Sequence, residues 1–325
     1  MLETRFTRLV GCTAPIQLAG MGAVITPELA AAVAGAGGLG MLGMAAEPLA
    51  VQLDAVGALG ARPVGVNFLG PFLDRGDLEL AADRAPVVEL FWLTPDAHLV
   101  ERIHRGGALA SWQVGSVDEA RLAVDVGCDL VVVQGVEAGG HVRGTVPLLP
   151  LLTAVLDAVG ADAVVVASGG IGSGRSMAAA LAAGADAVRV GSRFVASTES
   201  RAHADYKAAL VAAGVGDTVL NDEYGRETGW PDAPNRVLRS AFEEASALAG
   251  GVVGEERLPG TGERVPIPRF SVSPPTDACE GHVTAMALYA GESVASIHQV
   301  LPAADIVREL LSAAEALLAA ARSGG

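Results

Sequence analysis

VVVASGGIGSGRSMAAALAAGADAVRVGSR, residues 164–193, is the stretch that decides the fold. It contains two short runs rich in valine, 164–167 and 187–190, separated by an Ala-rich segment of helical composition. Each run ends in a small-residue turn, Gly169-Gly170 after the first and Gly191-Ser192 after the second. Strand, helix and strand in this order form a parallel βαβ unit, and the loops that follow such strands carry ligand-binding residues.

The same alternation extends back to the N-terminus. Further strand candidates lie at residues 16–18, 40–42, 64–67, 87–91, 109–112 and 130–134. Eight strands alternating with helical segments predict an α/β fold, a (β/α)8 TIM barrel, which needs about 250 residues. One helix start is explicit, because Thr26-Pro27-Glu28 offers an N-cap, a proline in the first turn and an acidic residue beside it.

The character of the sequence changes after about residue 200. Residues 201–290 are irregular and hold much of the Trp, Tyr and Pro content. We expect a barrel formed by 1–200 and 291–325, including a C-terminal helix, and a smaller, mainly helical subdomain at 201–290 that shapes the substrate pocket. Trp230, Tyr224 and Tyr289 are candidates to line that pocket, and buried packing is the alternative for each.

The charge of the chain limits its partners. The net charge is −15, without an acidic run, which argues against nucleic acid and anionic membranes as partners.

The three cysteines, Cys12, Cys128 and Cys279, are odd in number and lack CxxC spacing, so we expect neither a disulfide framework nor a metal site. The N-terminal residues lack an apolar signal region. A cytoplasmic enzyme acting on a small molecule is expected, and a homo-oligomer is left open.

The two turns after the last strands are the candidate phosphate site. Gly169, Gly170, Gly191 and Ser192 would present backbone N–H groups to an anion. Ordinary tight turns are the structural alternative. Two small-residue turns at both expected positions favour the phosphate site, with Arg175 or Arg193 as candidate charge partners.

The sixth strand leads into QGVEAGGH, residues 134–141. Gln134 can donate and accept hydrogen bonds, which suits the polar edge of a flavin ring. His141 follows Gly139 and Gly140, which places it at the barrel mouth, where a catalytic and a structural role are about equally supported. Glu137 is a candidate base, although no second carboxylate accompanies it.

Two earlier strand ends add candidates. Asn67 would place an amide over the barrel mouth, with a turn-forming asparagine as the alternative. Ala19, Gly20 and Met21 follow the first strand. The small residues among them allow main-chain contact with a flat ring, and Met21 could pack on it. An ordinary βα turn is the alternative there.

These pieces resemble the nitronate monooxygenases, also called 2-nitropropane dioxygenases, and the related flavin-dependent enoyl-ACP reductases. The matching pieces are residues 15–43, which begin PIQLAGMG, VGVN at 64–67, QGVEAGGH at 134–141 and residues 167–200, which begin ASGGIG, with a weaker match, YAGESVASI, at 289–297. The resemblance implies non-covalent FMN and makes His141 the catalytic histidine. It implies FMN contacts at Ala19, Gly20, Met21, Asn67, Gln134, Gly139, Gly140, Gly169, Gly170, Gly191 and Ser192.

The sequence departs from this family at a few positions. Gly20 stands where many members have proline, and Ser168 and Ser192 replace alanine and threonine. Glu292 stands where glutamine is frequent, and it would add a negative charge if it lay near the flavin. Three functions remain: oxidation of alkyl nitronates by O2 to carbonyl compounds and nitrite, NAD(P)H-dependent reduction of an enoyl thioester or quinone, and a barrel that binds another phosphate ligand.

Overall fold

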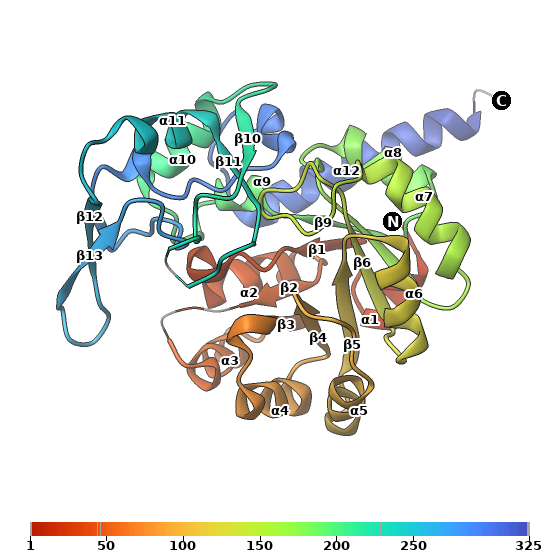
Figure 1. Cartoon of the computed structure of the whole chain (residues 1–325). Coiled ribbons are helices and arrows are strands. Elements are labelled where there is room, and N and C mark those ends of the chain that lie inside the picture. The colour runs from red at the N-terminus through yellow and green to blue at the C-terminus, as the bar shows by residue number, and fades with distance from the viewer. Residues whose placement is uncertain (1, 44, 46, 228, 324–325) are drawn as a thin grey trace.

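The computed structural model, which describes residues 2–43, 45, 47–227 and 229–323, is built around an eight-stranded parallel barrel (Figure 1). The strands are β1 (Ile16–Leu18), β2 (Gly40–Leu42), β3 (Val64–Leu69), β4 (Val87–Phe91), β5 (Leu109–Val114), β6 (Leu130–Gln134), β8 (Val164–Ser168) and β9 (Ala187–Val190). Each begins at the predicted residue, and three extend past the predicted end. The predicted (β/α)8 barrel is therefore confirmed.

The sheet closes on itself. Its strand order is β1-β9-β8-β6-β5-β4-β3-β2, and a parallel bridge between Gln17 and Leu39 joins the two outer strands. Most strand residues are buried and apolar, with valine the commonest, because helices cover the outer face of the strands and the barrel interior buries the other.

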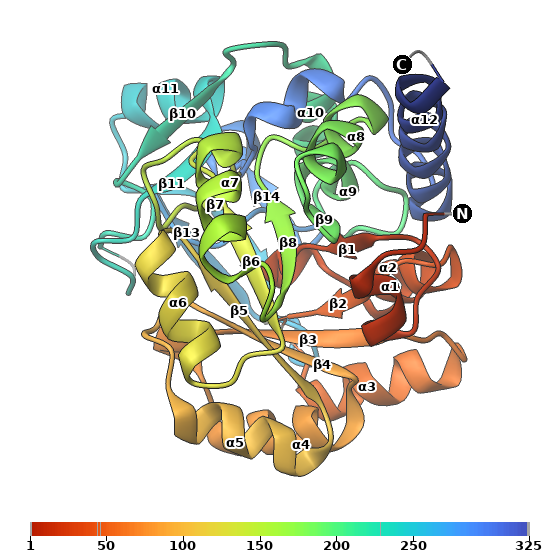
Figure 2. The ribbon, with the colours of Figure 1, turned by 90° about the vertical axis from the view of Figure 1, so that its right-hand side faces the viewer.

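Helices follow the strands around the barrel, as Figures 1 and 2 show. They are α1 (Arg5–Val10), α2 (Pro27–Gly35), α3 (Leu49–Ala58), α4 (Arg75–Arg84), α5 (Ala97–Gly106), α6 (Val117–Asp125), α7 (Leu148–Val159), α8 (Gly174–Ala182), α9 (Ser192–Val195) and α12 (Ala303–Ser323). The side chain of Thr26 accepts a hydrogen bond from the Leu29 N–H, which confirms the predicted N-cap of α2. The C-terminal α12 packs against α8 and α2. Among the described helices, none is long and apolar enough to cross a lipid bilayer.

The segment 201–290 is not mainly helical, which corrects that expectation. It has two helices, α10 (Ala204–Ala212) and α11 (Arg239–Ala247), a 3-10 turn η3 (Val283–Ala285), and the strands β10 (Thr218–Asn221), β11 (Asn235–Leu238), β12 (Val252–Arg257), β13 (Arg264–Pro268) and β14 (Cys279–Gly281). β12 and β13 lack the apolar pattern of a strand because most of their side chains are exposed, and Val253 and Ile267 are their buried residues. The boundaries at 201 and 290 remain a prediction.

One short strand links this segment to the barrel. β7 (Gly140–His141) lies in the loop after β6 and pairs with β11, with His141 opposite Asn235. β11 pairs in turn with β10, so the loop becomes the edge of a three-stranded sheet. The loop that carries His141 is therefore shaped by residues almost 100 positions later in the chain.

Candidate cofactor and active site

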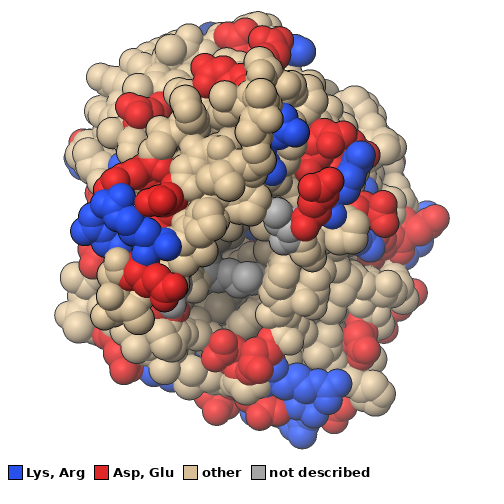
Figure 3. All heavy atoms as spheres, turned by 60° about the vertical axis from the view of Figure 1, so that its left-hand side comes forward, with Lys and Arg blue, Asp and Glu red and all other residues tan. Residues whose placement is uncertain are grey.

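A cavity of about 480 Å³ opens at the C-terminal ends of the barrel strands. Figure 3 shows a hollow on this side of the molecule, with mostly uncharged residues on its walls and charged side chains around its rim. This volume lies in the range of ordinary small-molecule sites. The position is the one at which barrels of this class carry their ligands.

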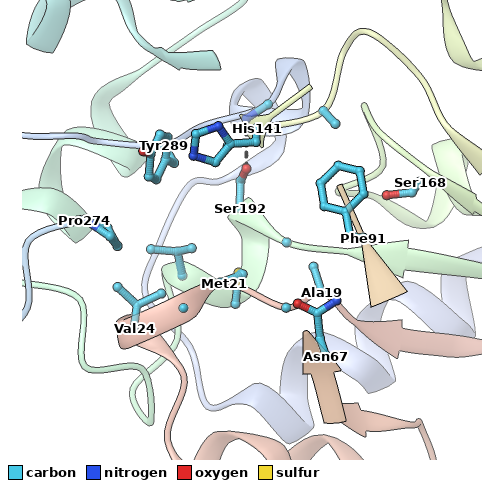
Figure 4. Close-up of a pocket in the computed structure, with 18 of the residues that line it drawn as sticks. Ala19, Met21, Val24, Asn67, Phe91, His141, Ser168, Ser192, Pro274 and Tyr289 are labelled. Carbon is cyan, nitrogen blue, oxygen red and sulfur yellow. Dashed lines mark hydrogen bonds between the residues drawn. The ribbon is translucent and has the colours of Figure 1, made fainter. Parts of the chain in front are cut away.

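All twelve residues predicted from the sequence line this one cavity. They are Ala19, Gly20, Met21, Asn67, Gln134, Gly139, Gly140, His141, Gly169, Gly170, Gly191 and Ser192. Figure 4 shows His141 and Tyr289 on one side of the cavity and Asn67 and Ala19 on the other. The ends of five strands, β1, β3, β6, β8 and β9, and the loops that follow them thus converge on a common space, although these residues are far apart in the sequence.

The two predicted phosphate turns fit an anion. Gly169 and Gly170 have φ values of 112° and 66°, which residues with a side chain rarely adopt. A Cβ atom on Gly169 would lie 3.1 Å from the Gly135 carbonyl oxygen. Within the described part of the chain, the N–H groups of Gly170 and Gly191 have no hydrogen-bond acceptor. Free N–H groups on a cavity wall suit a phosphate.

Neither candidate charge partner reaches the cavity. Arg175 is exposed on α8, and Arg193 lies 3.7 Å from the Glu309 carboxylate on α12. The Arg193 guanidinium also donates to the Gln299 carbonyl at 3.2 Å. Neither side chain therefore lines the cavity.

Asn67 and Gly20 fit each other closely. A Cβ atom on Gly20 would lie 2.3 Å from Asn67 Oδ1, so the amide occupies the space that a larger residue would need. The Asn67 Nδ2 donates to Glu89 Oε1 at 2.7 Å, which fixes the amide from below. The glycine at position 20 is therefore matched to the position of the asparagine.

Gln134 holds the histidine loop. Its Nε2 donates to the His141 carbonyl at 2.8 Å, and its Oε1 accepts from the Arg143 N–H at 3.0 Å. Half of its hydrogen-bonding capacity is therefore committed to the loop, and the other half remains for a ligand.

The surroundings of His141 keep its imidazole neutral. Burial lowers the pKa of His141 to about 4, although the nearby Ala233 carbonyl acts in the opposite direction. Nδ1 lies 3.1 Å from this carbonyl. Because a carbonyl oxygen only accepts, Nδ1 carries the hydrogen, and Nε2 retains its lone pair. The side chain is thus prepared to accept a proton.

Aromatic residues from 201–290 complete the wall. Trp230 and Tyr289 line the cavity, whereas Tyr224 is buried elsewhere in the segment. The Tyr289 hydroxyl donates to the Val272 carbonyl at 2.7 Å, and burial raises its pKa. Tyr289 therefore contributes surface to the cavity and is not placed to act as an acid.

Two carboxylates considered from the sequence have structural roles. Glu137 accepts from the Leu148 N–H at the start of α7, at 2.9 and 3.0 Å, so the candidate base is a helix cap. Glu292 does not line the cavity, and its Oε1 lies 2.8 Å from Arg236 Nη1 and accepts from the Thr218 hydroxyl. The negative charge of Glu292 is therefore not added to the cavity, because Arg236 neutralises it.

Sequence reasoning missed a polar network inside the barrel. Glu89 on β4 is fully buried, and its carboxylate pairs with Arg189 on β9 at 2.8 Å. Gln17 and Asn67 also donate to it, at 2.8 and 2.7 Å. A detectable signal existed, since each charged residue interrupts an otherwise apolar strand, VVELF at 87–91 and AVRV at 187–190.

The family model described as nitronate monooxygenase matches residues 3–87 and 71–313. The chain belongs to the nitronate monooxygenase family. Its relatives are oxidoreductases, and so is this protein.

Proteins with similar sequences are named for two different reactions. A (3aS,4S,5R,7aS)-5-hydroxy-7a-methyl-1-oxo-octahydro-1H-indene-4-carboxyl-CoA dehydrogenase of Mycobacterium tuberculosis is 37% identical over 248 residues, 75% of this chain and 68% of that protein. The nitronate monooxygenase of Pseudomonas aeruginosa is 31% identical over 366 aligned positions, 95% and 99% of the two chains.

Two solved structures have the same fold over nearly the whole chain. FabK from Thermotoga maritima has a TM-score of 0.77 and 30% identity, covering 100% of both chains. The nitroalkane oxidase from Streptomyces ansochromogenes has a TM-score of 0.72 and 29% identity, covering 98% of this chain and 99% of that one.

Proposed function

We propose that this protein binds FMN and uses O2 to oxidise alkyl nitronates to carbonyl compounds and nitrite. The observation that carries the proposal is the convergence of the twelve predicted residues on one cavity, with a neutral histidine in its wall. The relatives named nitronate monooxygenase support the same reaction class. We also propose that it acts in the cytoplasm.

FMN would supply the electron transfer, and the chain would supply position and charge. Gly169, Gly170, Gly191 and Ser192 would hold the phosphate through backbone N–H groups and one hydroxyl. Asn67, fixed by Glu89, and Gln134, fixed by the backbone of His141 and Arg143, would contact the polar edge of the ring. The Gly20 backbone would lie against the ring, and its missing side chain leaves room for the Asn67 amide.

We assign His141 the role of a base toward a neutral nitroalkane. Its Nε2 lone pair can take the proton from the carbon next to the nitro group, and the resulting imidazolium can then donate to the nitronate oxygen. Donation to an anionic nitronate from the start would need a hydrogen on Nε2. The Nδ1 contact with Ala233 disfavours that form at neutral pH.

A second candidate is redox chemistry on an acyl thioester, with NAD(P)H as electron donor. Its support is the 37% identity to a carboxyl-CoA dehydrogenase and the similarity to FabK along the whole chain. The apolar wall formed by Phe72, Phe91 and Trp230 would also accept a larger hydrophobic substrate.

Anaerobic reduction of the purified flavoprotein separates these functions. The protein is mixed with propionate 3-nitronate, NADH or NADPH, and the loss of flavin absorbance is followed. Rapid bleaching by the nitronate, with nitrite released under air, is expected. Bleaching by NADH or NADPH alone would establish the reductase, and a colourless protein that takes up no FMN would reject both.

The variant His141→Ala tests the histidine. We expect FMN to remain bound and turnover of neutral nitroethane to fall about 10²–10⁴-fold, the usual contribution of a general base. Turnover of a preformed nitronate should fall less, because that substrate has already lost its proton. Equal turnover of nitroethane by the variant and the wild type would remove His141 from the mechanism.

A further inference from the structure

The barrel holds a buried ion pair directly below the cavity. Arg189 is 5% exposed and Glu89 is 0% exposed, and Arg189 Nη1 lies 2.8 Å from Glu89 Oε1. Burial of two charges is costly unless each is well paired, and stability alone rarely requires such a pair. The position of the pair under a ligand cavity therefore calls for a functional explanation.

The two members of the ion pair lie at different depths relative to the cavity. Arg189 lines the cavity wall and Glu89 does not. Glu89 is held from the barrel interior by Gln17 and Asn67. The positive end of the pair therefore faces the ligand space, and its negative end lies deeper in the barrel.

Arg189 also has unused hydrogen-bond donors. Its contacts with Glu89 and with the Gln113 amide oxygen both use Nη1. A guanidinium has five N–H groups, so three, on Nε and Nη2, have no acceptor in the described part of the chain. Unpaired donors on a buried cation indicate a missing acceptor.

Arg189 is the only charged residue among the described residues that line this cavity. The whole chain carries a net charge of −15, so its long-range field opposes an anion. A negative charge that develops on a ligand over the barrel mouth has this one cation to stabilise it.

The guanidinium lies near the barrel axis and away from the phosphate turns. Arg189 starts on β9, and its contacts are Glu89 on β4 and Gln113 on β5, across the barrel. The phosphate turns lie at the rim after β8 and β9. The part of FMN over the axis would be its ring, next to Asn67 and Gln134.

We propose that Arg189 stabilises the negative charge that the FMN ring acquires on reduction. Full reduction adds two electrons and one proton to the ring and leaves one negative charge on it. The electrons come from the substrate of the proposed function, on which this inference rests. Arg189 thus makes the bound cofactor a better electron acceptor, with Glu89 holding the guanidinium in place.

The test compares dissociation constants of oxidised and dithionite-reduced FMN, measured on the full-length protein under nitrogen. The double variant R189Q/E89Q removes both charges without leaving either one buried alone. We expect its preference for reduced over oxidised FMN to fall at least tenfold, which is about 30 mV for a two-electron couple. The charge-conserving R189K should stay within about threefold of the wild type, and E89Q should increase the preference.

The control is Gly170→Ala in the phosphate turn, which should weaken both forms of FMN equally. A folded, FMN-loaded R189Q/E89Q protein with an unchanged ratio would overturn the inference and leave the proposed function standing. If R189Q/E89Q fails to fold, an unchanged ratio in E89Q would overturn it in the same way. Absence of FMN binding in the wild type would overturn the inference and the proposed function together.

Discussion

The imidazole of His141 lies against the indole of Trp230, with ring centroids 3.8 Å apart and ring planes inclined by 32°. His141 follows a barrel strand, and Trp230 belongs to the segment between α10 and α11. Trp230 is 4% exposed and keeps water from one side of the imidazole. The protonation of the candidate catalytic residue is therefore controlled by a residue from outside the barrel.

Replacing the indole should change the pKa of His141. In Trp230→Ala, water reaches the ring, and the pKa should rise from about 4 toward the ordinary value of 6.5. In Trp230→Phe, an aromatic ring still covers the imidazole, and the pKa should remain low. An NMR titration of the imidazole resonances measures both, and identical values in the wild type and Trp230→Ala would contradict the prediction.

The same pKa makes stability depend on pH. His141 titrates at about 4 when folded and near 6.5 when unfolded, so between these values the unfolded chain binds more protons. The contribution of His141 to the unfolding free energy is therefore constant above pH 6.5 and decreases as pH falls toward 4, by at most about 1.4 kcal/mol per unit.

Urea unfolding of the wild type and of His141→Asn at several pH values isolates this contribution. Asparagine does not titrate, so the difference between the two proteins should change between pH 6.5 and 4 and be flat above pH 6.5. Parallel pH profiles over the whole range would show that the histidine is not buried in its neutral form.

Replacing Arg236 should lower the unfolding free energy more than replacing its partner Glu292. Arg236→Met leaves the carboxylate without its partner and removes two hydrogen bonds to the Val136 carbonyl, at 2.8 and 3.2 Å. We expect a loss of about 1–3 kcal/mol. Glu292→Gln keeps an acceptor for Arg236, and a loss under about 1 kcal/mol is expected because the Glu292 side chain is 36% exposed. Chemical denaturation compares them, and equal losses would refute the asymmetry.

Gly139 should tolerate no side chain. A Cβ atom there would lie 2.4 Å from the Gly291 nitrogen and 2.6 Å from the Ala290 carbonyl carbon. Both are backbone atoms, so Gly139→Ala should cost about 1–3 kcal/mol and reduce FMN binding. The matched control is Gly57→Ala in α3, where a Cβ meets nothing within 4 Å and a gain of about 0.5–1 kcal/mol is expected. Similar melting temperatures for both variants would argue against this close contact.

The barrel and much of the cavity could be predicted because they depend on local patterns. Buried parallel strands need β-branched runs, and close backbone approach needs glycine, so residues 164–167 and Gly169-Gly170 are recognisable in the sequence. Their convergence then follows from the fold, since all eight strands point their C-terminal ends to the same side.

The remaining features depend on partners that are distant in the sequence. The charge of Glu292 is neutralised by Arg236, and Glu89 is paired with Arg189, 100 positions later. No local spacing predicts either pair. The mixed structure of 201–290 was missed because β12 and β13 expose most of their side chains, which removes the apolar pattern typical of strands.

The pairing of β7 with β11 also has a consequence for biosynthesis. All eight barrel strands and all twelve predicted site residues have been translated once residue 192 has left the ribosome. The partners that shape the histidine loop, Asn235 and the Gly291 backbone, emerge much later. The histidine loop can thus reach its final shape only after residues 235–291 have been made, so the active site is completed later than the barrel strands that carry it.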